Sequence, residues 1–498
     1  MIELVVFLAG AVIMALEILG TRVLNPAFGS GLYVWAALLT VTLVSLAAGY
    51  FLGGLAADRW PSRRALFAIP LLAAALLLVL VVASPAVLGA LEALELRLGA
   101  LAGAFTLFGL PLILLGMVTP FSVRLRAREI VRLGQVAGRL YALGTVGSVA
   151  GTLATAFVLV PHVGHRTALL GIAALLGALG AAGMALAGRP GRGVAAAALL
   201  GAGALALGLA GPRPTAIPGV LYDSEGLLGR ITVLERTYDD GYRERFFLVD
   251  GACQTHLPVD PEDGVDCEYI RLFDRIARWR PAAEHAYLIG LAGGAIVRLL
   301  GARDFTFDAA DIDRRSLPVA RDLFQAFDGD RLRFFLEDGR RQLRRMDRRY
   351  DAIVIDMLTI DALPFHLYSR EAFAEARDRL RPGGILALNS SLTFDRAGEF
   401  SSASLYRTLR TVFPHVRCYR AHTDRESRTE NRVFFASLEP LEPDPPEDPV
   451  APRRVHFGGA EGMVFTDAFN PYDVLLSSTS DTFRRMFRRA FPEVTRLR

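Results

Sequence analysis

The sequence predicts a multi-pass α-helical membrane domain followed by a water-soluble Rossmann-like α/β domain, with a small β-subdomain between them. Three observations support this fold class. Hydrophobic residues make up 52% of the 498 residues, and long apolar runs fill the chain up to about residue 212. Beyond that point, charged residues recur every few positions. Short apolar strands there alternate with helical stretches, which is typical of a parallel sheet covered on both faces.

Seven stretches in the first part approach the roughly 20 apolar residues that a membrane span needs. The first lacks a basic leader and runs into further apolar stretches, so we do not expect a cleavable signal peptide. The last is rich in Ala and Gly, and it could instead be a re-entrant or interfacial segment. The seven stretches are 3–19, 33–56, 65–90, 100–122, 140–161, 166–187 and 193–210.

Arginines gather in the loops after the second, fourth and sixth stretches, whereas the other loops hold only Arg22, Arg97 and Arg166. The positive-inside rule therefore predicts a cytoplasmic N-terminus. Seven spans would put the soluble half outside the cytoplasm, and six or eight would put it inside. The arginines concerned are Arg59, Arg63 and Arg64, then Arg124, Arg126, Arg128, Arg132 and Arg139, then Arg189 and Arg192.

Polar and small residues inside the spans have two interpretations each. Glu17 could contact a substrate or a proton, or it could pair with Arg22 at the interface. The loop 53–59 resembles the Gly…Asp-Arg loop of major-facilitator transporters, but it could equally be a tight helix–helix turn with an exposed ion pair. Close helix packing is expected at Gly144, Gly147 and Gly151.

Composition excludes several kinds of chemistry. The chain has no lysine, so Schiff-base and lysine-base catalysis are excluded. The net charge of +4 is modest and no basic run is interleaved with aromatics, so no nucleic-acid partner is expected. Cys253, Cys267 and Cys418 form no C-x-x-C pair, and we expect neither a metal site nor a disulfide framework.

The soluble half begins with a Pro-rich linker, 211–218, and a β-rich stretch. Alternating residues in 230–235 and 245–250 predict two strands, and Asp239-Asp240-Gly241 between them is a hairpin signal. A Pro- and acid-rich stretch, 439–449, reads as a second linker. The expected domains are 1–211 (membrane), 212–280 (linker and β-subdomain), 281–440 (Rossmann-like) and 441–498 (C-terminal extension).

Glycines and acids follow the strands of the Rossmann-like part. Strand 286–289 leads into Gly290-Leu-Ala-Gly293-Gly294, and three later strands end in Asp311-Ile-Asp313, Glu337-Asp338-Gly339 and Asp356. Ligands of such sheets bind beyond the carboxyl ends of the strands. The glycines allow close approach to a helix N-terminus, and Asp311 has the spacing of an acid that binds ribose hydroxyls. Together these signals predict an adenosyl-nucleotide site.

The ordered motifs resemble those of the spermidine synthases (polyamine aminopropyltransferases), and the whole chain is similar to membrane-fused members of that family. The resemblance implies the class I methyltransferase fold behind a small β-subdomain. It also implies decarboxylated S-adenosylmethionine as co-substrate and an amine as acceptor. The motifs are Val249-Asp-Gly251, Gln254, Tyr269, Ile289 to Gly294, Asp311 to Asp313, Asp338-Gly-Arg340, Tyr350 to Asp356, Phe365 to Glu371 and Leu380 to Gly384.

The resemblance also implies roles for individual residues. Gln254, Gly290, Gly293, Gly294, Asp311, Asp313, Asp338 and Gly339 would bind the cofactor. Tyr269 would contact the substrate, and Asp356 and Asp361 would be catalytic. An acid there is needed because an ammonium group must lose a proton before it can attack. Asp361 could also be an ordinary loop aspartate.

Two departures from the soluble enzymes leave alternatives open. Thr359 stands where their acid follows the strand-end aspartate, and Arg271 stands close to where they carry another acid. An arginine would repel a diammonium substrate. An S-adenosylmethionine-dependent methyltransferase and a non-catalytic transport or assembly module are therefore the alternatives. The expected setting is a bacterial inner membrane and a possible homodimer. An adenosyl co-substrate favours a cytoplasmic soluble half, against the count of seven spans.

Overall fold

The computed structural model describes the chain except residues 30, 92–93, 128–132, 189–194, 196–198, 205, 207–216, 227, 358–363, 422–428, 446, 449 and 496–498. The chain divides into two compact units. Unit 1 comprises Met1–Ala216 with Ser224–Gly229 and Arg496–Arg498, and unit 2 comprises Ile217–Asp223 and Arg230–Thr495.

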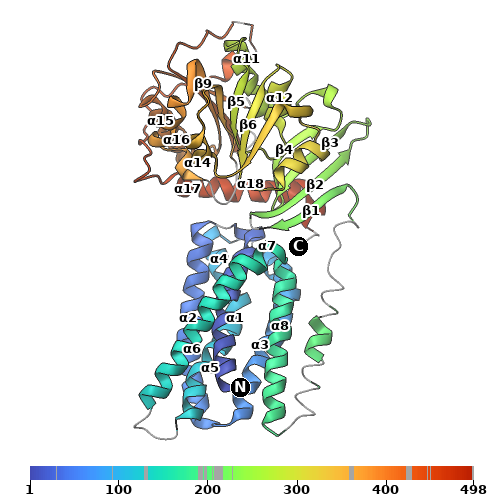
Figure 1. Cartoon of the computed structure of the whole chain (residues 1–498), viewed down its shortest axis with the longest axis vertical. Helices are drawn as coiled ribbons and strands as arrows, with labels where there is room; N and C mark the ends of the chain where they lie inside the picture. Colours follow the sequence, from blue (N-terminus) through green and yellow to red (C-terminus); the bar gives the residue numbers. More distant parts are fainter. Residues whose placement is uncertain are drawn as a thin grey trace. The chain divides into compact units, whose positions relative to one another are not determined.

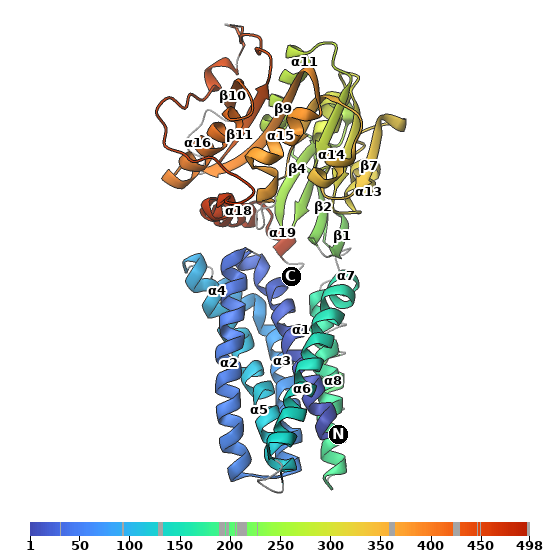
Figure 2. The ribbon, with the colours of Figure 1, turned by 60° about the vertical axis from the view of Figure 1, so that its left-hand side comes forward.

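Unit 1 is a bundle of long helices (Figures 1 and 2). Within the described residues, six stretches are long and apolar enough to cross a membrane, and they coincide with the first six predicted spans. The seventh, 193–210, lies mostly outside the described residues. The spans are α1 (Ile2–Phe28), α2 (Leu32–Arg59), α3 (Arg63–Leu91), α4 with η1 and α5 (Leu96–Ala104, Phe105–Gly109, Leu110–Arg126), α6 with η3 and α7 (Leu133–Ala154, Thr155–Leu159, Val160–His162), and α8 (His165–Leu186).

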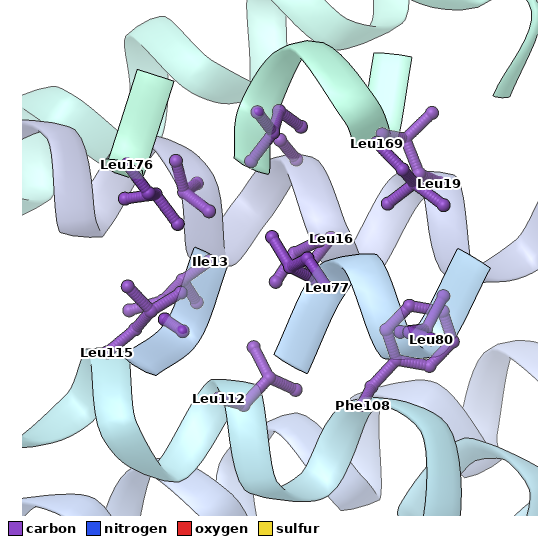
Figure 3. Packing of buried hydrophobic residues seen from close by; sticks show 14 of the residues in the cluster. Ile13, Leu16, Leu19, Leu77, Leu80, Phe108, Leu112, Leu115, Leu169 and Leu176 are labelled. Atoms are coloured by element: carbon purple, nitrogen blue, oxygen red, sulfur yellow. The ribbon is translucent and has the colours of Figure 1, made fainter. Parts of the chain in front are cut away.

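Leucine side chains from four of these spans fill the centre of the bundle. Figure 3 shows Leu16 of α1, Leu77 of α3, Leu112 of α5 and Leu176 of α8 facing one another. All four are at most 1% exposed. The helices are apolar along most of their length, and few polar side chains have to be buried between them. The apolar core follows from this composition.

Helices α1 and α6 approach closely because glycines of α6 face α1. A Cβ atom on Gly147 would lie 2.0 Å from the carbonyl oxygen of Phe7, and one on Gly151 would lie 2.2 Å from that of Ala11. Small residues permit such approach between membrane helices. The close packing predicted for this stretch is confirmed at both positions.

The polar residues noted in the spans lie in different settings. Glu17 is buried inside the bundle, at 8% exposure. Asp58, from the loop motif 53–59, forms an exposed ion pair with Arg124 at the end of α5, with 2.7 Å between nitrogen and oxygen. This motif therefore joins the ends of α2 and α5.

Unit 2 begins with a four-stranded sheet in the order β1-β2-β3-β4. Its strands are β1 (Val220–Gly226), β2 (Gly229–Thr237), β3 (Arg243–Val249) and β4 (Ala252–Pro258). The predicted hairpin joins β2 to β3 in antiparallel register, and Gly241 supplies the positive φ of +84° in its turn. Short helices α10 (Glu268–Arg271) and α11 (Arg275–Trp279) follow.

The larger sheet of unit 2 has seven strands in the order β10-β11-β9-β8-β5-β6-β7. The five from β7 to β9 in this order are parallel, and β10 and β11 are antiparallel. The predicted class I methyltransferase-like fold is thus confirmed. The strands are β5 (His285–Ile289), β6 (Thr306–Asp311), β7 (Leu332–Leu336), β8 (Tyr350–Ile355), β9 (Leu380–Thr393), β10 (His415–Arg420) and β11 (Thr429–Ser437).

Helices connect and cover these strands. Among them, α14 packs against β5 and β6, and α15 and α16 pack against β9. The chain moves outward from β5 to β7 and then returns to β8 on the other side of β5, so the sheet has its switch point between β5 and β8. The helices are α12 (Ala295–Gly301), α13 (Ser316–Pro318), α14 (Gly339–Arg345), α15 (Arg370–Asp378), α16 (Arg396–Arg410), α17 (Tyr472–Leu475), α18 (Ser477–Ala490) and α19 (Pro492–Thr495).

The stretch predicted as a second linker, 439–449, is packed onto the domain instead. The Arg275 guanidinium lies 2.5 Å from a carboxylate oxygen of Asp444 and 2.9 Å from one of Asp448. All three side chains are buried. The linker interpretation was wrong because composition alone does not reveal that a distant arginine pairs with these acids.

Candidate nucleotide-binding site

The turn after β5 has the backbone conformation that its glycines allow. Gly290 and Gly294 have φ of +92° and +79°, in the left-handed region that glycine adopts without strain. A Cβ atom on Gly290 would lie 2.5 Å from the carbonyl oxygen of Asp356. Gly294 is the N-cap of α12, so the turn leads into a helix N-terminus, whose first N–H groups have no acceptor within the helix. Gly293 lies in the same turn, against Thr255.

Asp311, at the end of β6, accepts a hydrogen bond from this turn. One of its carboxylate oxygens accepts the Leu291 N–H at 3.0 Å, and the other accepts the Asp313 N–H at 2.8 Å. Burial raises the pKa of Asp311, and these two hydrogen bonds oppose the rise. Asp313 is paired with the Arg315 guanidinium, at 2.6 Å. Both predicted acids are therefore engaged within the protein, beside the glycine turn.

Asp356 follows β8 at the switch point and has two side-chain partners. Asn389 Nδ2 donates to one carboxylate oxygen at 3.1 Å, and the Tyr269 hydroxyl donates to the other at 3.3 Å. Burial raises the pKa of Asp356 to about 6, against the lowering effect of these two hydrogen bonds. Burial and the nearby Asp356 carboxylate raise the pKa of Tyr269 well above its usual value, so its hydroxyl stays protonated.

Four of the predicted site residues line one pocket at this edge of the sheet. Gln254 comes from β4, Tyr269 from α10, Gly290 from the glycine turn and Asp356 from the end of β8. Leu288, Leu291, Ala292, Ala295, Ile296 and Thr255 complete the lining. The pocket thus combines an apolar wall, a helix N-terminus and a carboxylate with a raised pKa. Such a combination is typical of a functional site.

Asp338 and Gly339 lie at a second pocket of about 270 Å³, lined also by Phe365 and His366. Asp338 caps α14 by accepting the Arg341 N–H at 2.8 Å, and His366 Nε2 lies 2.9 Å from its other oxygen. The hydrogen bond with His366 lowers the pKa of Asp338. A Cβ atom on Gly339 would lie 2.4 Å from Ile289, so glycine lets α14 pack against β5.

The C-terminal segment closes one side of this second pocket. Asp467 pairs with the buried Arg340 at 2.7 Å and accepts a hydrogen bond from Ser369. Asn470 Nδ2 donates to the carbonyl oxygen of Phe365 at 2.7 Å. Asp467 and Asn470 both line the pocket. The segment 466–471 is therefore built into the wall of the site.

Of the two departures noted in the sequence, Thr359 and Arg271, the structure describes only Arg271. Thr359 and the predicted catalytic Asp361 lie outside the described residues. Arg271 is 54% exposed, pairs with Asp266 at 2.8 Å, and is not among the pocket-lining residues. Its charge is thus directed toward a surface acid, and the repulsion expected from it is reduced.

Sequence reasoning missed two polar partners of the site. Asn389 directly follows the apolar strand segment 385–388, a polar residue at the edge where β8 also ends. His366 lies in the motif Phe365 to Glu371, but no site role was predicted for it. Its contact with Asp338 joins residues 28 positions apart. Among the described residues, no group of three or more His, Cys, Asp or Glu side chains could hold a metal ion.

Fold and site define the class of unit 2: a class I methyltransferase-like domain with a nucleotide-type pocket at its switch point. In the same chain, unit 1 carries six apolar helices that could span a membrane.

Comparison with known proteins identifies the relatives of this domain. The polyamine aminopropyltransferase 2 of Pseudomonas aeruginosa is 33% identical over 187 residues, covering 36% of this chain and 52% of the relative. The polyamine aminopropyltransferase of Vibrio vulnificus is 27% identical over 198 residues, covering 38% and 62%. The predicted resemblance to polyamine aminopropyltransferases is confirmed, although the chain spans only about half the length of these curated relatives. No protein-family model matches the sequence.

Two spermidine synthases are among the solved structures to which the chain has a low similarity. A probable spermidine synthase from Corynebacterium glutamicum has a TM-score of 0.41 and 15% identity, covering 53% of this chain and 95% of that one. The spermidine synthase from Thermotoga maritima has a TM-score of 0.35 and 21% identity, covering 45% and 74%.

Proposed function

We propose that the chain is a membrane-tethered aminopropyltransferase, which moves the aminopropyl group of decarboxylated S-adenosylmethionine to an amine. The observation that carries the proposal is the Asp356 carboxylate, with a pKa of about 6, in a pocket with Gln254, Tyr269 and the glycine turn. At neutral pH this carboxylate is mostly ionised and can hold an ammonium group. The relatives named above are polyamine aminopropyltransferases, which agrees with this chemistry.

The reaction needs a neutral amine beside an electrophilic carbon. The amine nitrogen forms a bond to the carbon next to the sulfonium, the carbon–sulfur bond breaks, and its electrons remain on sulfur as a neutral thioether. The proton leaving nitrogen requires a nearby base. Asp356 is positioned by Asn389 and Tyr269 and can orient the amine and accept this proton. Asp361, two residues after Thr359, is a second candidate for the proton.

Arg271 bears on the choice between aminopropyl and methyl transfer. An intact S-adenosylmethionine carries a carboxylate, which an arginine such as Arg271 could bind. Its ion pair with Asp266 and its absence from the pocket lining weaken that alternative. Decarboxylated co-substrate, which lacks the carboxylate, does not require this arginine.

The test is methylthioadenosine release by the detergent-purified full-length protein with decarboxylated S-adenosylmethionine and a panel of amines. We expect amine-dependent release that Asp356→Asn lowers by at least about a hundredfold, the lower range for loss of an acid–base group. Asp322→Asn is the matched control, because Asp322 is an exposed acid on η7 (Val319–Leu323) paired with its neighbour Arg321. Release unaffected by Asp356→Asn would refute the role of this carboxylate. Binding without release for every amine would instead favour methyl transfer or a non-catalytic module.

A further inference from the structure

Glu17 of α1 is an acidic side chain buried inside the helix bundle of unit 1. Glu3 of the same helix pairs with Arg126 at an exposed position, whereas no ion pair within the described residues includes Glu17. The pairing with Arg22 that the sequence left open is therefore not formed. A carboxylate at membrane depth is costly without a charge of opposite sign. Neither the proposed aminopropyl transfer nor the packing of the bundle gives this carboxylate a partner.

Thr155 faces Glu17 across the interface between α1 and α6. The two helices run parallel, as the glycine contacts described above show. At this interface the Ser148 hydroxyl donates to the carbonyl oxygen of Gly10 at 3.2 Å. Seven residues further along both helices, which is about two turns, the corresponding pair is Glu17 and Thr155. The segment η3, which begins at Thr155, accordingly packs against α1.

Thr42 reaches the same level from α2. Helices α1 and α2 follow one another through residues 29–31 and are antiparallel. A Cβ atom on Gly20 would lie 2.7 Å from Cδ2 of Leu38, so these two residues face each other. One turn back along α1 from Gly20 is Glu17, and one turn forward along α2 from Leu38 is Thr42. Because the helices are antiparallel, both steps lead in the same direction and bring Thr42 level with Glu17.

Both threonine hydroxyls are buried without a hydrogen bond. Thr42 is 3% exposed and Thr155 is 1% exposed, and neither Oγ1 atom has a hydrogen-bond partner within the described residues. Thr21 and Thr152 instead donate to carbonyl oxygens of their own helices, which is the common solution for a helical threonine. Buried polar groups normally have partners. Two unpaired hydroxyls level with a buried carboxylate therefore indicate a ligand.

The chemistry of the three side chains limits what this ligand can be. They offer oxygen atoms only, which hard cations prefer, and a single negative charge, which neutralises a monovalent ion. A divalent ion would keep an uncompensated charge in the apolar interior. The close approach of the helices at Gly20 and Gly147 favours a small ion over an organic amine. A protonated carboxyl would hydrogen-bond a neighbouring hydroxyl, yet neither hydroxyl has such a bond.

We propose that Glu17, Thr42 and Thr155 form a site for a monovalent metal cation of sodium size inside the bundle of unit 1. The Glu17 carboxylate neutralises the ion, and the two hydroxyl oxygens supply part of its coordination shell. The position of η3 agrees with this site, because π-helical turns are frequent at functional sites and irregular backbone at membrane depth is tolerated where it lines one. Ion binding here is independent of aminopropyl transfer in unit 2.

The test is equilibrium binding of radioactive sodium to the detergent-purified full-length protein. We expect saturable binding that Glu17→Gln abolishes. Thr42→Val and Thr155→Val should each weaken binding about tenfold, as for the loss of one contact to a charged group. Thr42→Ser keeps the hydroxyl oxygen and should bind sodium as the wild-type protein does. Lithium should compete with sodium, and organic amines should not.

Two matched variants control for unspecific effects on the same helices. Glu3→Gln changes an exposed acid of α1, and Thr40→Val changes an exposed threonine of α2. Both should bind sodium normally. Replacing potassium by sodium in the buffer should also raise the Tm of the wild-type protein and of both controls, because a ligand that binds only the folded state stabilises it. The Tm of Glu17→Gln should not respond.

Other results would overturn the proposal. Absence of saturable sodium binding would do so, as would binding that survives Glu17→Gln. Equal losses in Thr42→Ser and Thr42→Val would show that packing, and not the hydroxyl oxygen, matters at this position. This pair also keeps the test valid if Glu17→Gln does not fold. A carboxylic-acid infrared band that is lost in Glu17→Gln and does not respond to sodium would assign a proton to Glu17 in place of a metal ion.

Discussion

The pH dependence of aminopropyl transfer should show the titration of Asp356. With a pKa of about 6 in the free protein, about one tenth of these carboxyls are ionised at pH 5 and about nine tenths at pH 7. If the ionised form binds and deprotonates the amine, kcat/KM should rise about tenfold between these values from this group alone. Because the carboxylate binds the amine in its ammonium form and removes the proton itself, kcat/KM should level off above pH 7, and the carboxyl is recognised as a break in slope near pH 6.

Asn389→Ala moves this break in a predictable direction. Asn389 donates to the carboxylate at 3.1 Å and so favours its ionised form. A hydrogen bond to a charged group is worth about 1.5 to 3 kcal/mol, and one pKa unit corresponds to about 1.4 kcal/mol. Water in the pocket that Asp356 lines replaces part of the lost bond. We therefore expect the break to move upward by about one unit, to near pH 7.

The assay is methylthioadenosine release at subsaturating amine from pH 5 to 8, for the wild-type chain and Asn389→Ala. Tyr269→Phe, which removes the other donor, should move the break in the same direction. A profile without a break in this range would show that Asp356 does not control the reaction. A break that stays at the same pH in Asn389→Ala would assign the titration to another group.

Three further predictions concern packing and charge. Gly147→Leu should lower the thermal stability of the purified protein by several degrees, whereas Gly138→Leu on the same helix should not, because no atom lies within 4 Å of a Cβ there. Arg432→Met should destabilise unit 2 by about 3 kcal/mol in thermal or urea unfolding, because it removes the guanidinium 2.9 Å from the buried Glu430, whose other arginine, Arg420, lies farther away at 3.6 Å. Arg271→Ala should change the KM for the amine by less than about twofold, since Arg271 is exposed and already paired with Asp266. A larger fall in KM would show that the positive charge of Arg271 repels the bound amine.

The sequence predicted the parts of the fold that depend on local patterns. Apolar run length located six spans, and strand–helix alternation located the parallel strands. The acids at the strand ends were found because parallel strands end at the same edge of a sheet. The antiparallel β10–β11 pair was not foreseen, since its pairing with β9 depends on contacts distant in the chain.

The roles of the site residues depend on such distant contacts. Asp311 and Asp338 were predicted as ligand-binding acids, and the structure adds protein partners for both: Asp311 accepts the Leu291 N–H and Asp338 contacts His366. Neither contact follows from spacing. The stretch 439–449 was misread for the same reason, because its ion pair to Arg275 joins residues more than 160 positions apart. A sequence pattern identifies which residues lie at the carboxyl-end edge of the parallel sheet. Their hydrogen-bond and ion-pair partners become known only from the fold.

The side of the membrane that holds unit 2 is open to a direct test. Within the described residues the chain has six apolar helices, an even number, which returns Leu186 to the side of the N-terminus. The arginine-rich loops predict that this side is cytoplasmic. We therefore expect a cytoplasmic unit 2, unless residues 187–216 cross the membrane once more. Such a crossing would make seven spans.

Cysteine labelling distinguishes the two arrangements, but Cys418 cannot serve as the probe, because it is fully buried. Asp322→Cys places a thiol on an exposed position of unit 2. Ser62→Cys, in the exposed connection between α2 and α3, and Arg97→Cys, at the exposed start of α4, mark the two sides of the bundle. In intact cells, an impermeant maleimide should label position 97 and spare 62 and 322. Labelling of 322 together with 97 would place unit 2 outside the cytoplasm, where an adenosyl co-substrate is scarce, and would therefore count against the proposed aminopropyl transfer.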